Sequence, residues 1–252
     1  MRLDELYKKI TVYHYMITFL SVLGLVGIFT TQDLSLVPQL VLAPILAAAL
    51  DYAVTYLQYK RKIIPQSAII SGLFVATILP ANLLAAVAGV VIVVAGKHII
   101  RFNERHIFNP AGFGILVSAL LFGTGTAWWS SASLLIIPLG LFISYKIQRL
   151  YISLPFLAIF AVGTAITNVI RGIAITPISF LNLATIFMAF FMAVEPRTTP
   201  HTKKGMLIFA AILGIAYFVT LFLTSNYNIA ADFMLLSLLF TNVFTENLNK
   251  LS

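Results

Sequence analysis

Apolar runs follow one another along almost the whole chain, and this pattern limits the possible folds more than any other feature. Hydrophobic residues make up 60% of the 252 residues and charged residues only 10%, with a mean hydropathy of +1.00. A soluble domain carries about a quarter charged residues, whereas a helix that crosses a bilayer needs about 20 predominantly apolar residues. We therefore predict an all-α, polytopic membrane protein whose residues 1–252 form a single transmembrane domain.

The basic residues lie between the apolar runs and predict the topology. Ten crossings are expected, at Ile10–Phe29, Leu36–Leu57, Gln66–Leu79, Asn82–Ala95, Pro110–Phe122, Ala132–Lys146, Ile152–Asn168, Pro177–Val194, Met206–Leu223 and Ile229–Phe244. With ten crossings, 15 of the 16 Lys and Arg residues fall on one face, and Arg171 is the exception. Since Lys and Arg accumulate in cytoplasmic connections, we expect a cell-membrane protein with both termini in the cytoplasm.

Ten crossings divide into two sets of five, and an odd repeat unit places the second copy upside down in the membrane. The approximate repeats are residues 1–125 and 126–252. Phe74–Pro80 (FVATILP) and Phe190–Pro196 (FFMAVEP) are similar, and each precedes another expected helix. On the expected topology, the first lies outside and the second inside, as inversion requires. The sequence therefore predicts two inverted five-helix repeats.

Composition also excludes several function classes. The net charge of +8 comes from short connections between apolar runs, where anionic lipid headgroups attract basic residues, so we expect the lipid bilayer and no nucleic acid as a partner. The absence of Cys excludes disulfides and thiolate-ligated iron–sulfur clusters. His98, His106 and His201 fall in expected connections rather than on facing helices, which argues against a haem. The sequence has no spacing typical of a metal site.

Four segments carry a resemblance to a known family. They are, in order, Ser71–Pro80 (SGLFVATILP), Gly96–Gly114 (GKHIIRFNERHIFNPAGFG), Phe190–Gly205 (FFMAVEPRTTPHTKKG) and Ser237–Asn249 (SLLFTNVFTENLN). Together they resemble the B subunit of sodium-translocating NADH:quinone oxidoreductase and the D subunit of the Rnf electron-transport complex. Glu195 stands where that family usually has Asp.

The resemblance implies ten helices in two inverted halves, similar to the urea-transporter architecture. It also implies a bound flavin, electron passage from the cytoplasm toward the outside, and other membrane and redox subunits as partners. Members with covalent FMN attach it to the Thr of a Ser-Gly-Ala-Thr-like motif in the outer loop between helices five and six. Here that loop, residues 123–131 (GTGTAWWSS), lacks the motif. We therefore expect a non-covalent flavin, either FMN or riboflavin, with a quinone as a further possibility.

We expect a set of residues near the cytoplasmic ends of the central helices to line the cofactor site or its mouth. They are Lys97, His98, Asn109, Pro110, Gly112, Glu195, Arg197 and Thr199. Asn109 and Pro110 are typical residues for a helix start, where Asn caps free N–H groups. The same helix N-terminus would attract a phosphate, a carboxylate or a flavin carbonyl. Both interpretations remain open.

Two acidic residues are candidates for special roles. Glu195 directly follows an apolar run, where an ionised carboxylate needs a partner, and Arg197 or contact with water can supply it. Asp51 lies within an expected membrane helix. It is either a proton or cation ligand, a partner for a base on another helix, or a structural interhelical hydrogen-bonding group.

The leading functional hypothesis is a membrane subunit that relays electrons through its flavin or quinone. A small-solute transporter or channel with the same inverted-repeat fold is the alternative, and the missing flavin-attachment motif agrees with it. A scaffold subunit with an empty cavity is a third hypothesis.

Overall fold

The computed structural model describes residues 11–102 and 105–251. The helices of the first half are α2 (Val12–Thr31), α3 (Val37–Tyr59), α4 (Gln66–Ile78), α5 (Leu83–Ile99) and α6 (Pro110–Phe122). Those of the second half are α7 (Ile136–Lys146), α8 (Leu150–Ile170), α9 (Leu183–Phe187), α10 (Lys203–Asn226), α11 (Phe233–Asn242) and α12 (Thr245–Leu248). A π-helical turn, Met188–Met192, continues α9. Short 3-10 turns cover Leu34–Leu36, Trp129–Ser131 and Pro177–Phe180.

Within the described residues, the β structure is one small antiparallel hairpin, β1 (Arg101–Phe102) and β2 (Arg105–His106). Apart from this hairpin, the regular structure of the described residues is helical, and this confirms the expectation of an all-α fold. In the part of the chain that the structure describes, four helices are long and apolar enough to cross a membrane: Val12–Thr31, Leu34–Tyr59, Leu150–Ile170 and Lys203–Asn226. The shorter apolar helices include α4, α5, α6, α7 and α11. The molecule is a multi-pass membrane protein.

Each expected apolar range contains a helix, but several boundaries were wrong. Helix α5 continues to Ile99 instead of ending at Ala95. Lys97 and His98 lie in this additional turn and contact the Asp51 carboxylate, which stabilises it. Helix α7 begins at Ile136 rather than Ala132, because Trp129–Ser131 forms a separate turn. The first residue of the Ile10–Phe29 range lies outside the described residues, as do the N-terminal residues Arg2, Lys8 and Lys9.

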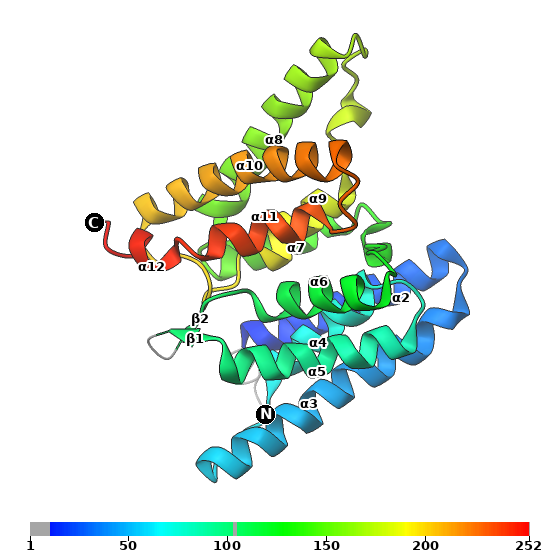
Figure 1. Ribbon diagram of the computed structural model, residues 1–252, viewed down its shortest axis with the longest axis vertical. Helices are drawn as coiled ribbons and strands as arrows, with labels where there is room; N and C mark the ends of the chain where they lie inside the picture. Colours follow the sequence, from blue (N-terminus) through cyan, green and yellow to red (C-terminus); the bar gives the residue numbers. More distant parts are fainter. Residues whose placement is uncertain (1–10, 103–104, 252) are drawn as a thin grey trace, which may run out of the picture.

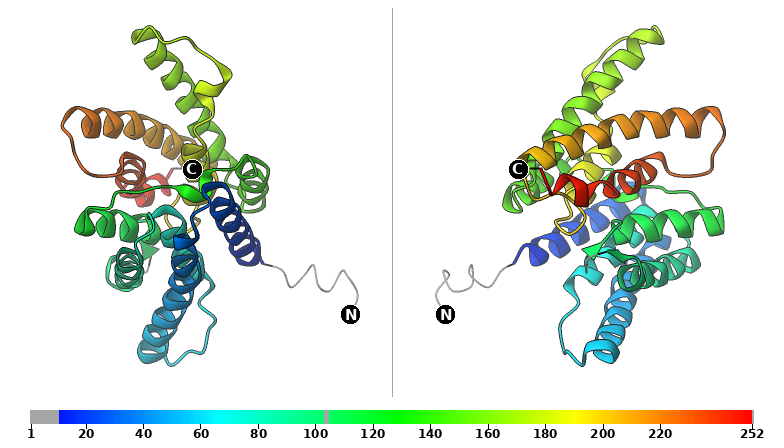
Figure 2. Two further views of the ribbon diagram at one scale, coloured as in Figure 1. Left: turned by 90° about the vertical axis from the view of Figure 1, so that its right-hand side faces the viewer. Right: turned by 60° about the vertical axis from the view of Figure 1, so that its left-hand side comes forward.

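The two halves of the chain lie on either side of a central helix pair (Figures 1 and 2). Helices α6 and α11 pack side by side and run in opposite directions in the middle of Figure 1. Helix α5 flanks α6, helix α10 flanks α11, and α3 and α8 lie at opposite extremes of the molecule. At Gly114, a Cβ atom would come within 2.3 Å of Val93 Cγ2, so only glycine permits this approach of α6 to α5.

Several connections meet at one end of the bundle. Arg149, between α7 and α8, contacts His201 Nδ1 at 3.0 Å, and Arg105 of the hairpin contacts His201 Nε2 at 2.7 Å. The backbone N–H of His201 donates to Asn249 Oδ1, which follows α12. Burial and the two arginines lower the pKa of His201 below its usual value. Basic connections far apart in the sequence thus share one face, next to the site described below.

Candidate functional site

Asn109 joins three segments at the start of α6. Its Oδ1 accepts a hydrogen bond from the N–H of Gly112 at 2.8 Å, which confirms the predicted helix cap above Pro110. Its Nδ2 donates to the carbonyl of Met192 at 3.1 Å, and its backbone N–H donates to Asn242 Oδ1 at 2.9 Å. Asn109 is 2% exposed. One residue therefore caps α6 and ties it to the ends of α9 and α11.

The π-helical turn Met188–Met192 is a feature that sequence reasoning missed. Such turns widen a helix by one residue and occur often at functional sites. Here the turn is fully buried, and it ends at Met192, whose carbonyl accepts the hydrogen bond from Asn109. It places Phe191 at a cavity between the two halves.

This central cavity has a volume of about 350 Å³, within the range of about 300–1,000 Å³ typical of small-molecule sites. Most of its walls are apolar. Aromatic rings come from Tyr13, Phe74 and Phe191, and the polar groups include Asn109 and Glu195. The remaining lining residues are Val12, Met16, Ser67, Ile70, Ser71, Ala111, Ile147, Val194, Pro196 and Arg197.

Glu195 is the acidic group of the central cavity. Burial raises its pKa to about 7, although a hydrogen bond from Thr198 and the charge of Arg197 act in the opposite direction. The Thr198 hydroxyl donates to Glu195 Oε2 at 3.1 Å, and the Thr199 hydroxyl donates to the Glu195 carbonyl at 2.8 Å. The Thr198 carbonyl is fixed in turn by Asn242 and Thr245. Near neutral pH, Glu195 is poised to take up or release a proton.

Arg197 does not form an ion pair with Glu195, which was one of the two alternatives that the sequence left open for this carboxylate. Its guanidinium donates instead to His106 Nε2, at 3.4 Å. His106 is 6% exposed, and its pKa falls to about 4 because burial, Arg197, Lys97 and Arg101 all disfavour its charged form. His106 is therefore neutral at pH 7 and accepts this hydrogen bond from Arg197.

A second cavity, which we call the basic vestibule, opens beside the central cavity and has a volume of about 490 Å³. Its basic and histidine side chains are Arg61, Lys97, His98, Arg101, His106 and Arg197, and its acidic residue is Asp51. Its other lining residues are Tyr13, Thr55, Tyr59, Ile63, Ile64, Pro65, Gln66 and Ser67. Tyr13, Ser67 and Arg197 line both cavities, so the vestibule and the central cavity are contiguous.

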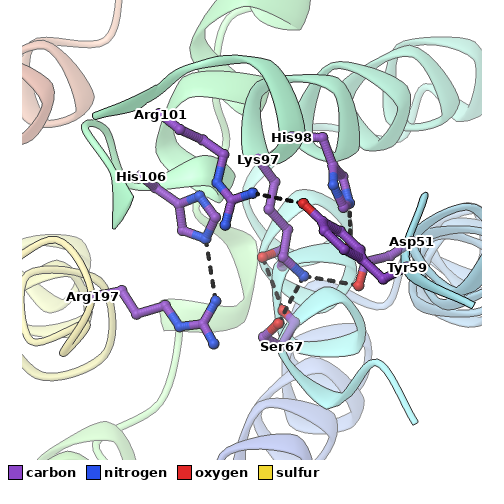
Figure 3. A network of polar contacts seen from close by, with 9 residues as sticks. Asp51, Tyr59, Ser67, Lys97, His98, Arg101, His106 and Arg197 are labelled. Carbon is purple, nitrogen blue, oxygen red and sulfur yellow. Dashed lines mark hydrogen bonds and ion pairs between the residues drawn. The ribbon is translucent and has the colours of Figure 1, made fainter. Parts of the chain in front are cut away.

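Asp51 is held by two neighbouring bases, as Figure 3 shows. Lys97 Nζ lies 2.9 Å from Asp51 Oδ2 and donates also to Ser67 Oγ at 2.9 Å. His98 Nε2 lies 2.9 Å from Asp51 Oδ1. Asp51 is 4% exposed. The structure supports one of the alternatives for Asp51, namely that it is the partner of bases on another helix. Lys97 and His98 both belong to the last turn of α5.

The expected site residues divide into three groups. Asp51, Lys97, His98 and Arg197 line the basic vestibule, and Asn109, Glu195 and Arg197 line the central cavity. Pro110, Gly112 and Thr199 line neither. Pro110 and Gly112 belong to the first turn of α6, where the Gly112 N–H donates to Asn109. The Thr199 hydroxyl donates to the Glu195 carbonyl.

Sequence reasoning missed several lining residues. Tyr13 lies on α2, for which the sequence carried no motif. Ser71 and Phe74 belong to the segment Ser71–Pro80, which carries part of the family resemblance, but neither was expected to line a cavity. Arg101 belongs to the segment Gly96–Gly114 and was likewise not expected at the site. For Ser71, Phe74 and Arg101, membership in a segment that resembles the family was the signal available in the sequence.

Comparisons with known proteins identify the family of the chain. Residues 115–252, more than half of the chain, match the NQR2, RnfD, RnfE family. The D subunit of an ion-translocating oxidoreductase complex from Haemophilus ducreyi is 31% identical over 115 residues, which cover 42% of this chain and 32% of that protein. The chain thus spans about a third of the length of this curated relative. Because the family match covers most of α6 and all of the second half, the chain belongs to the NQR2, RnfD, RnfE family.

Proposed function

We propose that this chain is a membrane subunit of an ion-translocating oxidoreductase complex and relays electrons across the cell membrane through a flavin held non-covalently in the central cavity. The observation that carries the proposal is the cavity itself, which lies where the start of α6 meets the end of α9, within a chain of this family. The relative from Haemophilus ducreyi is named as a subunit of such a complex.

The packing of α6 against α11 supports two inverted repeats of five helices. Asn109 caps α6, and Asp232 caps α11 in the same way, by accepting from the N–H three residues later. The α6 start is tied to Asn242 at the end of α11, and the α11 start is tied to Thr126 and Trp128, which follow α6. Each helix start is thus bound to the end of the other, as a two-fold axis in the membrane plane would require. Both termini would then lie in the cytoplasm.

The residues of the central cavity fit a flavin. A flat, largely apolar ring needs aromatic neighbours, and Tyr13, Phe74 and Phe191 supply them. The polar edge of the ring needs hydrogen-bonding groups, which Asn109 and Glu195 provide. When bound, the flavin would supply one- and two-electron redox chemistry, while the protein positions it and excludes water. Glu195 would hold or release a proton beside it, since its pKa lies near 7. A quinone head is the alternative occupant.

The outer end of the interface favours electron passage over solute passage. Trp129 donates from Nε1 to the carbonyls of Ala76 and Leu79, and Trp128 donates to Asp232 at 2.7 Å. Both indoles are 6% exposed. A solute that left along the interface of the two halves at these indoles would have to displace them. A transporter or channel would require these side chains to move, whereas electron transfer would not.

The thickness of the membrane implies that partner subunits take part in electron transfer. The hydrocarbon core is about 30 Å thick, and one flavin near its cytoplasmic side would span only part of it. Other membrane and redox subunits would therefore bring electrons to this site and take them away.

Flavin titration tests the proposal. Purified protein in detergent is expected to bind riboflavin or FMN with quenching of flavin fluorescence. Ser71→Phe places a ring in the central cavity and should abolish binding, whereas Ala158→Phe adds the same ring to an exposed position on α8 and should not. A wild-type protein that binds no flavin would refute the proposal. If it also conducted small solutes in liposomes, it would be a transporter, and if it did neither, a scaffold subunit.

A further inference from the structure

Two long helices begin next to each other at the end of the bundle that carries the basic connections. Helices α8 and α10 pack side by side (Figure 1). Arg149, which directly precedes α8, contacts Met206 near the start of α10, with 3.6 Å between Nη1 and Sδ. Lys203, the first residue of α10, lies over the ring of Tyr151 of α8, with Nζ 5.3 Å from the ring centre. The two helix starts therefore form one surface region, which we call the α8–α10 start.

The charges at the α8–α10 start are the reverse of those that a helix N-terminus favours. Free backbone N–H groups give a helix start a partial positive charge, so that Asp and Glu are favourable there and Lys and Arg are not. Arg149 nevertheless occupies the N-cap position of α8 and forms no side-chain cap, and Lys203 and Lys204 are the first two residues of α10. In these described helices, neither first turn contains an acidic residue. Three cations thus lie at two positive helix ends.

The burial of Arg149 is an independent indication of an anionic ligand. Arg149 is 6% exposed, and its Nε atom has no hydrogen-bond partner. Arginine is almost never buried unless it is paired, yet the ion pairs among the described residues are both at Asp51. The Arg149 guanidinium contacts Met206 Sδ and His201 Nδ1, and neither atom is anionic. A buried charge of this kind is costly unless an anion from outside the chain balances it.

His201 does not satisfy the basic groups around it. Its Nδ1 lies 3.0 Å from Arg149 and its Nε2 lies 2.7 Å from Arg105, so guanidinium groups face both ring nitrogens. A neutral imidazole accepts at one nitrogen only, because the other carries the proton. One of the two contacts is therefore not a hydrogen bond, and the guanidinium at that contact retains an N–H group for another acceptor. Glu246 of α12 affects the pKa of His201 less than either arginine does.

We propose that the α8–α10 start binds the phosphate group of an anionic phospholipid. Guanidinium and ammonium groups both bind phosphate oxygens, and a lipid with a net negative charge would balance part of the positive charge. The inference does not depend on the flavin, because Arg149, Lys203 and Lys204 line neither the central cavity nor the basic vestibule.

The surroundings of these cations suit a lipid better than a soluble anion. Helices α8 and α10 are both long and apolar enough to cross a membrane. Tyr151, Leu154 and Leu207 are 44%, 46% and 45% exposed. Leu154 lies three residues after Tyr151, and Leu207 lies four residues after Lys203, so each leucine is on the same helix face as its partner in the cation–ring contact. A phosphate at the cations would thus have an apolar surface for its acyl chains beside it.

The test compares an anionic with a zwitterionic phospholipid. Protein in detergent micelles would be titrated with dioleoylphosphatidylglycerol or with dioleoylphosphatidylcholine, and bound lipid would be counted by native mass spectrometry. We expect one phosphatidylglycerol to bind at least about tenfold more tightly than phosphatidylcholine, since each basic residue near an anionic lipid contributes about fivefold. Equal affinities would overturn the inference and leave the proposed function intact. Inorganic phosphate at the same concentration should not displace the lipid, and displacement would identify a soluble anion as the ligand and overturn the lipid assignment.

Variants test which residues are responsible. Arg149→Gln removes the buried charge and should lower the ratio of the two affinities at least about fivefold. Because Arg149 is buried, its replacement can also affect folding, so the double variant Lys203→Gln/Lys204→Gln at two exposed positions is the second test and should lower the ratio about tenfold or more. Arg171→Gln removes a charge from the opposite end of α8 and should leave the ratio unchanged. Thermal melts in phosphatidylcholine micelles report whether each variant is folded. A folded double variant that keeps the wild-type ratio would overturn the inference.

Discussion

Replacement of Asp51 by asparagine is expected to destabilise the protein strongly, because two bases depend on its carboxylate. Lys97 and His98 each lie 2.9 Å from one Asp51 oxygen, and the Asp51 side chain is 6% exposed. Asparagine keeps one acceptor oxygen but loses the charge. The remaining oxygen can accept from Lys97 or from His98, and the Lys97 ammonium no longer has a charged partner in Asp51.

The expected magnitude follows from the burial of the pair. Removal of one partner from a fully buried ion pair costs about 3–5 kcal/mol. Lys97 lines the basic vestibule, and its side chain is 11% exposed, so water reaches part of the charge that is left behind. We therefore expect Asp51→Asn to lower the free energy of unfolding by about 2–3 kcal/mol, which corresponds to a decrease in Tm of about 4–12 °C for a chain of this length.

A double-mutant cycle measures the interaction directly. Lys97→Met removes the ammonium and keeps most of the apolar side chain, and the double variant removes both charges. The double variant should be more stable than the sum of the two single losses predicts, by at least about 1 kcal/mol. The assay is unfolding in mixed micelles followed by tryptophan fluorescence. Additive losses would refute the reasoning, because they would mean that Asp51 and Lys97 do not stabilise each other.

Four further predictions concern single features of the structure. Burial raises the pKa of Glu195 from 4.5 to about 7, so the folded protein binds more protons than the unfolded chain between these values. Stability should then fall by about 3 kcal/mol as pH rises from about 4.5 to 7, and thermal melts of Glu195→Gln should lack this fall. Asn109→Ala removes a helix cap and the hydrogen bond to Met192, and it should lower the free energy of unfolding by about 2–3 kcal/mol. Asn82→Ala removes only a helix cap and should lower it by about 1 kcal/mol, as measured by chemical unfolding. Protein co-expressed with a flavin transferase should give no fluorescent band on a denaturing gel, since Thr126 lies outside any acceptor motif and donates its hydroxyl hydrogen to Asp232. A band lost in Thr126→Ala would show the opposite. Reporters fused after Lys62, Arg105 and Lys204 should be cytoplasmic, and one at Ser130 external; a cytoplasmic Ser130 would contradict ten crossings.

Much of the fold could be predicted from the sequence because lipid imposes a simple rule. Apolar segments must be helical when no water is available for their backbone groups, so the positions of the helices follow from composition. The start of α6 was predicted at the correct residue, because Asn109 and Pro110 are local signals for a helix start. The end of α5 was not, because the extra turn is stabilised by Asp51, which is 46 residues from Lys97 in the sequence.

The candidate site could be predicted only in part, for the same reason. The motifs identified Lys97, Asn109, Glu195 and Arg197 as residues near one another, and the cavities contain them. Their partners depend on packing between helices. Arg197 was one of two possible partners for Glu195, with water as the other, because the two residues are close in the sequence. It donates instead to His106 from the other half of the chain.

Electron transfer across a membrane tests the central claim most directly. The protein would be reconstituted with FMN into liposomes that enclose ferricyanide, and dithionite, which does not cross the bilayer, would be added outside. The account predicts that the enclosed ferricyanide is reduced only when both protein and flavin are present, and that Ser71→Phe abolishes the reduction while Ala158→Phe does not. No reduction by the flavin-loaded protein, together with rapid equilibration of urea or glycerol across the same liposomes, would contradict the account and identify a solute pathway instead.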